Sequence, residues 1–229
     1  MLVDCGPDKK ILAKLGAALP FYDRTIDYVL ATHPDLDHYG GCVDVLKNYN
    51  VKEIIINGHK KSNDPYWQAW DKAIKDEPNA VVKVMSNPEK WTIASSTLDF
   101  LSPDASLALG VAPADSNNYS IVFKLQSAST SFLFTGDMEE PLEKALVQKY
   151  CSSTSTCQAL QADVLKVGHH GSGGSSGAEF LGLVQPKIAV ISVGKNNHYG
   201  HPSLRVLKKL DRVGAETLRT DELGDIIEK

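Results

Sequence analysis

One ten-residue run, THPDLDHYGG at positions 32–41, constrains this chain more than any other feature. It places two imidazoles and two carboxylates within six residues: His33, Asp35, Asp37 and His38. A divalent cation needs several ligands from one compact loop, and histidine with aspartate supplies neutral nitrogen together with anionic oxygen. The alternative is a solvated polar turn. Because crowded carboxylates without a cation are costly to bury, the run predicts a metal-binding loop.

Length and composition narrow the remaining choices. The 229 residues fit a single domain spanning positions 1–229, with 42% hydrophobic and 23% charged residues. A net charge of -4 gives no bulk attraction toward nucleic acid, so a basic surface would have to be local. The sequence has no apolar run of the roughly 20 residues that a membrane span requires, and we identify no signal peptide.

Short apolar segments alternate with amphipathic ones, which predicts an α/β or α+β layered domain. Residues 51–57 are nearly all Val and Ile, a pattern typical of a strand buried on both faces. Most histidines and several aspartates follow the end of a strand, where layered folds gather catalytic groups. The first expected strand lies within 2–6, where it ends in a turn. The other expected strands are 26–31, 51–57, 80–85, 98–101, 119–125, 132–134, 163–167, 188–193, 217–220 and 225–227. The expected helices are 42–48, 64–77, 141–150, 178–184 and 202–213.

The run at 32–41 resembles the His-x-His-x-Asp-His signature of metallo-β-lactamase-fold hydrolases, with Asp35 in place of the second histidine. Four further segments extend this resemblance to the metallo-β-lactamase domain of ComEC-type DNA-internalisation competence proteins. They are 117–120 (NNYS), 134–137 (FTGD), 165–172 (LKVGHHGS) and 192–202 (SVGKNNHYGHP), with 219–221 (RTD) after them. The resemblance implies an αββα sandwich that lacks its first strands. The abrupt start at Leu2 fits either a strand that begins the chain or a missing leading segment.

The resemblance implies two divalent metal ions, zinc or manganese. It assigns one metal to His33, Asp35 and Asp137, and the other to Asp37, His38, Asp137 and either His169 or His170, with His169 preferred. Asp137 would bridge the two, and a hydroxide held between them would attack the substrate. Many members carry another histidine about twenty residues before the bridging aspartate. Here 117–120 contains none, so an asparagine oxygen or a water would complete the first site. Its two carboxylates favour Mn²⁺ as a competitor of Zn²⁺.

Other residues are candidates for catalysis and substrate binding. Asp37 would orient the hydroxide, and His198 and His201 would donate a proton to the leaving group, unless these histidines cap the following helix. Candidate substrate contacts are Asn118, His170, Ser172, Lys195 and Arg219. The loop at 168–177, rich in glycine and serine, either borders the site or is a flexible linker. His59 either lines the cleft or is an ordinary hydrogen-bonded histidine.

The resemblance therefore implies a phosphodiesterase, most simply a nuclease for single-stranded DNA. One alternative is an esterase, a lactonase or a phosphorylcholine esterase-like enzyme with a small substrate. Another is a binding module without catalysis. No protein partner can be inferred. The compartment is cytoplasmic by default, or extracytoplasmic if the chain belongs to a competence-type protein.

The four cysteines do not have zinc-ribbon spacing. Cys5 and Cys42 are most simply core residues. Cys151 and Cys157 are either a disulfide or two free thiols.

Overall fold

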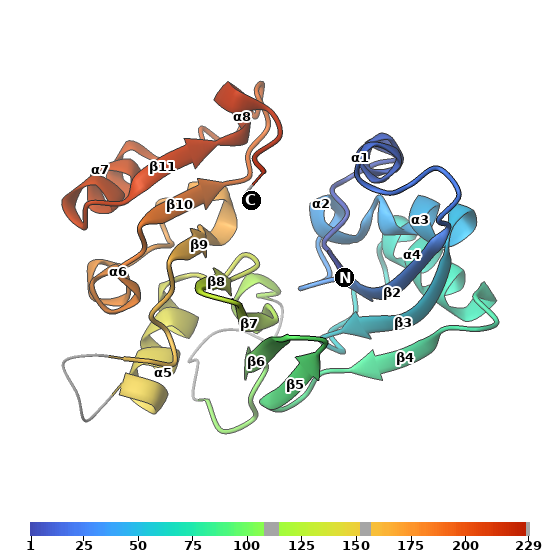
Figure 1. The fold of residues 1–229 in the computed structure, drawn as a ribbon, viewed down its shortest axis with the longest axis horizontal. Helices are drawn as coiled ribbons and strands as arrows, with labels where there is room; N and C mark the ends of the chain where they lie inside the picture. The colour runs from blue at the N-terminus through green and yellow to red at the C-terminus, as the bar shows by residue number, and fades with distance from the viewer. Residues whose placement is uncertain (108–114, 152–156, 228–229) are drawn as a thin grey trace. The chain divides into compact units, whose positions relative to one another are not determined.

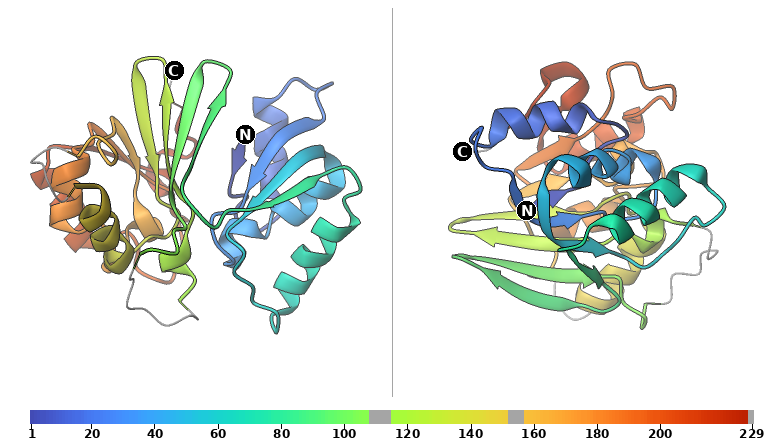
Figure 2. Two further views of the ribbon diagram at one scale, coloured as in Figure 1. Left: turned by 90° about the horizontal axis from the view of Figure 1, so that it is seen from below. Right: turned by 90° about the vertical axis from the view of Figure 1, so that its right-hand side faces the viewer.

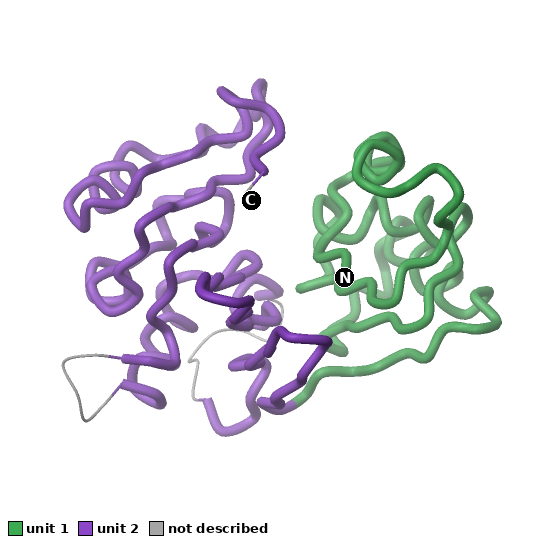
Figure 3. Tube along the Cα trace, viewed as in Figure 1, with its two compact units in different colours: residues 1–86 green, residues 87–229 purple. Residues whose placement is uncertain are grey.

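The computed structural model describes residues 1–107, 115–151 and 157–227. The chain divides into two compact units, residues 1–86 (unit 1) and 87–229 (unit 2), coloured separately in Figure 3. The prediction of a single domain is not tested by this division, and each unit is described by itself.

Unit 1 contains a four-stranded parallel sheet in the order β1-β2-β3-β4 (Figure 1). The strands are β1 (Leu2–Val3), β2 (Thr25–Leu30), β3 (Asn50–Ile56) and β4 (Val81–Val84). The helices are α1 (Lys10–Ala18), α2 (Leu36–Tyr39), α3 (Cys42–Asn48) and α4 (Pro65–Asp76). Side chains from α1, α3 and α4 pack with those of β2 and β3 in one core, which includes Leu15, Val45, Trp70, Val29 and Ile54.

Unit 2 contains a seven-stranded sheet in the order β11-β10-β9-β8-β7-β6-β5. Its strands are β5 (Glu89–Ile93), β6 (Ser96–Ser102), β7 (Val122–Ser127), β8 (Thr130–Phe134), β9 (Val164–Lys166), β10 (Ile188–Ile191) and β11 (Glu216–Arg219). Strands β5 to β8 pair antiparallel, whereas β8 to β11 pair parallel. The helices are α5 (Glu140–Cys151), α6 (Ala178–Val184), α7 (Leu204–Arg212) and α8 (Thr220–Leu223), with short 3₁₀ turns η1 (Asn117–Tyr119) and η2 (Gly168–Gly171).

Three helices of unit 2 cover one face of its sheet (Figure 2). Leu146 of α5, Leu181 of α6 and Leu210 of α7 pack with Leu133 and Leu165 of the strands in one buried cluster. Phe132, Phe134, Val190 and Leu218 are among the residues that line a hollow of about 280 Å³ in unit 2. Along β10, Ala189 and Ile191 thus belong to the core while Ile188 and Val190 line this hollow, as expected for the alternation of a strand.

Most expected elements are present, with the following differences. The strand expected at 119–125 begins only at Val122. Residues Asn117–Tyr119 instead form a 3₁₀ turn, and the side-chain oxygen of Asn118 accepts the backbone N–H of Leu142 in α5. Residues 225–227 are not a strand; the short helix α8 comes before them. The expectation missed α1 and β5. Strand β3 is buried on both faces only at Ile54 and Ile55, since Lys52 is exposed and pairs with Asp27.

Both cysteine pairs form disulfides. Cys5 and Cys42 are buried in the core of unit 1, as the sequence predicts, and they also form a disulfide that the sequence analysis did not predict. The sequence could not reveal this pair because the two residues are 37 positions apart and meet only through the fold. Cys151 joins Cys157, which decides the alternative left open by the sequence. The loop between them, 152–156, lies outside the described residues.

In the part of the chain that the structure describes, no helix is long and apolar enough to cross a membrane.

Candidate metal centre

The candidate metal ligands of unit 1 follow the carboxyl ends of its parallel strands. The register pairs Val3 of β1 with Leu30 of β2, so that Asp4 lies beside Thr32. His33 follows directly, and α2 brings His38 back against the same strand ends, where its carbonyl oxygen accepts the N–H of Cys5.

Asp4 organises this cluster, although the sequence analysis did not select it. Its carboxylate accepts hydrogen bonds from the backbone N–H and the hydroxyl of Thr32, at 2.8 and 3.0 Å. It also lies 2.7 Å from Nδ1 of His38. Burial raises the pKa of Asp4, but the charge and hydrogen bond of His38, with help from His33 and Thr32, outweigh burial and hold this pKa below its ordinary value. Asp4 is therefore an anion that orients its neighbours.

Both imidazoles of unit 1 are buried, and each has Nδ1 beside a polar group, Thr32 for His33 and Asp4 for His38. Nδ1 of His33 lies 3.0 Å from the Thr32 hydroxyl, whose own proton points to Asp4. Nε2 of His33 lies 3.9 Å from Oδ1 of Asp35, and Nε2 of His38 lies 3.9 Å from Oδ2 of Asp37. Asp35 also accepts a hydrogen bond from Nζ of Lys61 at 2.7 Å. A cation from the chain itself therefore already pairs with one predicted metal ligand.

In unit 2, a sharp turn after β8 positions Asp137. Gly136 has a positive φ of 53°, which favours glycine, and its carbonyl oxygen accepts a hydrogen bond from Lys166. The buried Asp137 donates its backbone N–H to the hydroxyl of Ser120 at 3.0 Å. The carboxylate is thus held at the same sheet edge as the residues that follow β9 and β10.

His169 and His170 follow β9 with a left-handed backbone, φ 45° and 52°. Such conformations are costly for histidine and concentrate at functional sites. Nδ1 of His169 lies 2.8 Å from Oε1 of Glu139, and Nδ1 of His170 lies 2.6 Å from the carbonyl oxygen of Ser192. Their Nε2 atoms lie 3.9 and 3.4 Å, respectively, from Oδ2 of Asp137.

The donor sets fit a metal ion in both units. Carboxylate and carbonyl oxygens only accept hydrogen bonds, so Nδ1 carries the proton in His38, His169 and His170, and the Thr32 hydroxyl imposes the same form on His33. In its neutral form, which metal binding requires, each ring then presents a lone pair on Nε2, the arrangement that fixes metal-ligating histidines. Two ligand atoms about 2.1 Å from one metal in tetrahedral geometry lie about 3.4 Å apart, close to the separations from Nε2 to carboxylate.

The structure leaves the choice between His169 and His170 open. Within unit 2, Nε2 of His170 lies closer to Oδ2 of Asp137, at 3.4 Å, than Nε2 of His169 does, at 3.9 Å. Burial lowers the pKa of His169, but its hydrogen bond to Glu139 and the charges of Asp137 and Glu139 outweigh this and leave the pKa raised.

The stretch at 117–120 supports Asp137 through hydrogen bonds. The oxygen of Asn118, a predicted substrate contact, is buried and accepts the backbone N–H groups of Glu139 and Leu142 at the start of α5. Asn117 lies against His169, its Nδ2 3.3 Å from Nδ1 of the ring. The side chains expected to replace the missing histidine therefore hold α5 and contact His169.

The loop at 168–177 is tied down rather than a free linker. Ser175 donates its hydroxyl to the carbonyl oxygens of Gly168 and Ser172, and the buried carboxylate of Glu143 accepts the N–H groups of Ser176 and Gly177. Ser172, a predicted substrate contact, is half-buried in this loop and accepts the N–H of Gly174.

The other predicted residues follow β3 and β10 or, in the case of Arg219, end β11. His198 and Lys195 are exposed, and His201 is half-buried with its ring centroid 5.6 Å from that of His169. Burial and the neighbouring His169 and His170 lower the pKa of His201. Arg219 pairs with Asp221 and Glu222, so its guanidinium is already engaged. His59 is half-buried after β3, and burial lowers its pKa.

Four contributors were not selected from the sequence: Asp4, Lys61, Glu139 and Ser192. Asp4 follows a strand and could have been found by the same strand-end argument as His33. The other three gave no signal, since they act through contacts between residues 22 to 30 positions apart.

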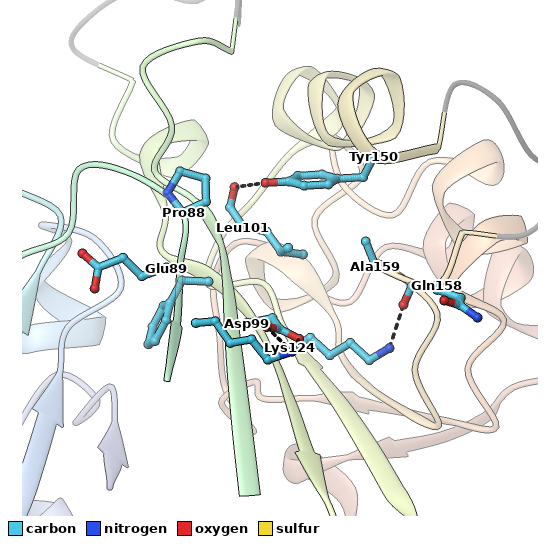
Figure 4. A pocket seen from close by; sticks show the side chains of 10 residues that line it. Pro88, Glu89, Asp99, Leu101, Lys124, Tyr150, Gln158 and Ala159 are labelled. Carbon is cyan, nitrogen blue, oxygen red and sulfur yellow. Dashed lines mark hydrogen bonds and ion pairs between the residues drawn. The ribbon is translucent and has the colours of Figure 1, made fainter. Parts of the chain in front are cut away.

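A separate pocket of about 360 Å³ in unit 2 is lined by Leu101, Lys124 and Tyr150 among others (Figure 4). Lys124 donates to the carbonyl oxygen of Gln158. Tyr150 lies near the carboxyl end of α5, whereas Asp137 precedes its amino end, and a 12-residue helix is about 18 Å long. This pocket is therefore remote from the histidines of unit 2.

The metallo-beta-lactamase superfamily model matches residues 1–195, most of the chain. The chain belongs to the metallo-beta-lactamase superfamily. This confirms the fold that the motifs predicted, an α/β fold with two sheets.

Within this superfamily, the chain is similar to competence proteins. It is 36% identical over 203 residues to ComE operon protein 3 of Bacillus subtilis, covering 89% of this chain and 24% of the relative. It is 30% identical over 201 residues to competence protein ComA of Neisseria gonorrhoeae, covering 88% and 25%. The chain thus spans about a quarter of the length of these relatives.

Solved metallo-beta-lactamase structures share the fold at low identity. A metal-dependent hydrolase, Tm1679, matches with a TM-score of 0.55 and 11% identity, covering 94% of this chain and 84% of that one. YhfI from Bacillus subtilis matches with a TM-score of 0.53 and 14% identity, covering 95% and 82%.

Proposed function

We propose that this chain is a metal-dependent phosphodiesterase that cleaves single-stranded DNA. The observation that carries the proposal is the common state of four histidines, His33, His38, His169 and His170. In each, Nδ1 has a fixed hydrogen-bond partner and Nε2 lies 3.4–3.9 Å from a carboxylate oxygen. The likeness to competence proteins supports DNA as the substrate.

The proposed ligands follow the family pattern. His33, Asp35 and Asp137 would hold one divalent metal ion, and Asp37, His38, Asp137 and either His169 or His170 the other. Bound metal would lower the pKa of water enough to supply a nucleophile near neutral pH. Asp37 would orient that water, and His201, whose pKa is lowered, would exchange a proton with the leaving oxygen together with His198.

Digestion of end-labelled single-stranded DNA with Mn²⁺ tests the proposal. We expect cleavage by the parent chain and none by Asp137→Ala, together with loss of bound metal measured by elemental analysis. Retention of metal and turnover by Asp137→Ala would reject the assignment of Asp137. An inactive but metal-loaded parent would reject the nuclease and favour the esterase or lactonase alternative.

The identity of the metal ion is tested by comparing turnover with Mn²⁺ and with Zn²⁺. The site with His33, Asp35 and Asp137 has two carboxylates and one imidazole, a harder donor set than a multi-histidine zinc site. We expect Mn²⁺ to support turnover at least as well as Zn²⁺ after reconstitution of the metal-free chain. Full activity with zinc and none with manganese would contradict this expectation.

A further inference from the structure

The loop after β10, residues 194–201, presents an aromatic side chain with no role in the metal centre. Tyr199 is 84% exposed, among the most exposed large hydrophobic residues that the structure describes. Its ring stacks on that of His201, with centroids 5.9 Å apart and an interplanar angle of 19°. One face of the phenol ring is thus supported by the protein while most of the side chain remains open to solvent.

This loop is held in place by its own hydrogen bonds. Asn197 donates its side-chain amide to the carbonyl oxygens of Gly194 and His201, and accepts the N–H of His201. These three bonds close the loop around one side chain. Tyr199 is therefore carried by a preorganised loop, which reduces the entropy lost when a ligand binds.

The two residues that directly follow this loop, Pro202 and Ser203, pack against the residue after the histidine pair. The N–H of Ser203 donates to the carbonyl oxygen of Gly171, the residue after His170. A Cβ atom on Gly171 would lie only 2.7 Å from Cβ of Pro202, so glycine is required for this close approach. The ring of His201 lies between those of Tyr199 and His169, 5.9 and 5.6 Å from them. A row of three rings therefore leads from the exposed Tyr199 to the imidazole beside Asp137.

We propose that Tyr199 is a stacking platform for one unpaired base of a single-stranded nucleic acid whose phosphodiester lies at the histidine pair. The inference rests on the proposed function and assigns its substrate-binding residue. Every base has a π face, so stacking on a supported tyrosine binds single strands without selecting a sequence. The exposed Lys195 of the same loop supplies a local positive charge for the phosphate backbone, which the net charge of the whole chain does not.

Steady-state cleavage of single-stranded DNA by the metal-loaded chain tests the platform. Stacking contributes about 1–3 kcal/mol per base, so Tyr199→Ala should raise KM about 5- to 150-fold, whereas Tyr199→Trp should keep it near the parent value. The matched control is Tyr66→Ala, which removes another exposed tyrosine, 62% exposed on α4 of unit 1, and should leave KM unchanged.

Oligonucleotides with a single abasic position provide a double-mutant cycle. At one position relative to the cut, loss of the base should raise KM for the parent chain but cause no further rise for Tyr199→Ala. Additive effects at every position, or an unchanged KM for Tyr199→Ala, would overturn the platform while leaving the nuclease intact. Loss of self-association by Tyr199→Ala with unchanged KM would assign the ring to a protein contact and also overturn it. A parent chain that cleaves no single strand would overturn the proposed function, and the inference with it.

Discussion

The Asp4 carboxylate lies 2.7 Å from Nδ1 of His38, although the two residues are 34 positions apart in the chain. A carboxylate behind a metal-ligating imidazole fixes its tautomer and raises its basicity, and loss of such a partner typically costs 10- to 100-fold in metal affinity. The Asp4 carboxylate also holds Thr32, which in turn contacts His33. One carboxylate thus orients both imidazoles of unit 1.

We therefore expect Asp4→Asn to weaken metal binding about 10- to 100-fold. Isothermal titration calorimetry of the metal-free chain with Zn²⁺ or Mn²⁺ measures this change in affinity. Asp27→Asn is the control, because Asp27 is an exposed aspartate of β2 whose carboxylate pairs with Lys52. Equal affinities for Asp4→Asn and the parent chain would show that Asp4 does not support a metal ligand.

If Asp35 binds a metal ion as proposed, Lys61 competes with that ion for the carboxylate. Its ammonium lies 2.7 Å from Oδ1 of Asp35 and must leave before that oxygen can ligate a cation. Lys61→Met should therefore strengthen binding of the metal ion assigned to His33, Asp35 and Asp137, by about 1.4- to 5-fold for a partly exposed pair. The adjacent exposed Lys60→Met is the control. If Lys61→Met instead binds this metal ion more weakly than the parent chain, the lysine helps to hold the site together.

Glu143 makes the stability of unit 2 depend on pH. Burial raises the pKa of its carboxyl group to about 7, despite the N–H groups of Ser176 and Gly177, with a further contribution from Glu140 and an opposing one from Lys209. The folded chain therefore binds the proton more tightly than the unfolded chain. Its contribution to stability is complete below about pH 4.5 and is lost as the pH rises through about 7.

Glu143→Gln should remove this dependence. Between pH 4.5 and 8, the parent chain should lose about 3 kcal/mol of unfolding free energy relative to the glutamine variant. Urea unfolding at several pH values measures this difference, and groups common to both proteins cancel. Parallel pH profiles for the two proteins would show that Glu143 ionises normally in the folded state.

The two disulfides should differ in their contribution to stability. The chain-entropy relation gives about 4 kcal/mol for the separation of 37 residues between Cys5 and Cys42, and about 2 kcal/mol for the separation of 6 between Cys151 and Cys157. Replacing each pair by alanine and measuring urea unfolding tests this order. Fluorescence of Trp67 and Trp70, both buried in unit 1, monitors the unfolding of the variant that lacks the disulfide between Cys5 and Cys42.

Removal of the first pair should also disturb metal binding. Cys5 follows Asp4, and Cys42 follows the two glycines that end the metal-binding run.

A Cys5→Ala/Cys42→Ala variant that is as stable as the Cys151→Ala/Cys157→Ala variant would contradict the entropic argument.

The sequence alone determined the family, the candidate metal-binding run and most of the elements. His33, Asp35, Asp37 and His38 occur in one short run, and a ligand set this dense has few uses other than metal binding. Apolar periodicity located most strands and helices because each pattern is set by residues close together in the chain. The placement of histidines after strands followed from the same local pattern.

Only the tertiary structure decided which residues support these ligands. The pairing of β1 with β2 brings Asp4 to Thr32 and His38, and the folding of α5 against the loop at 168–177 brings Glu143 to Ser176. The disulfide between Cys5 and Cys42 and the pairing of Lys61 with Asp35 depend on similar long-range contacts. A hydrogen bond or a disulfide forms over a few ångströms in space, and separation along the sequence carries no information about that distance until the strand register and helix packing are known.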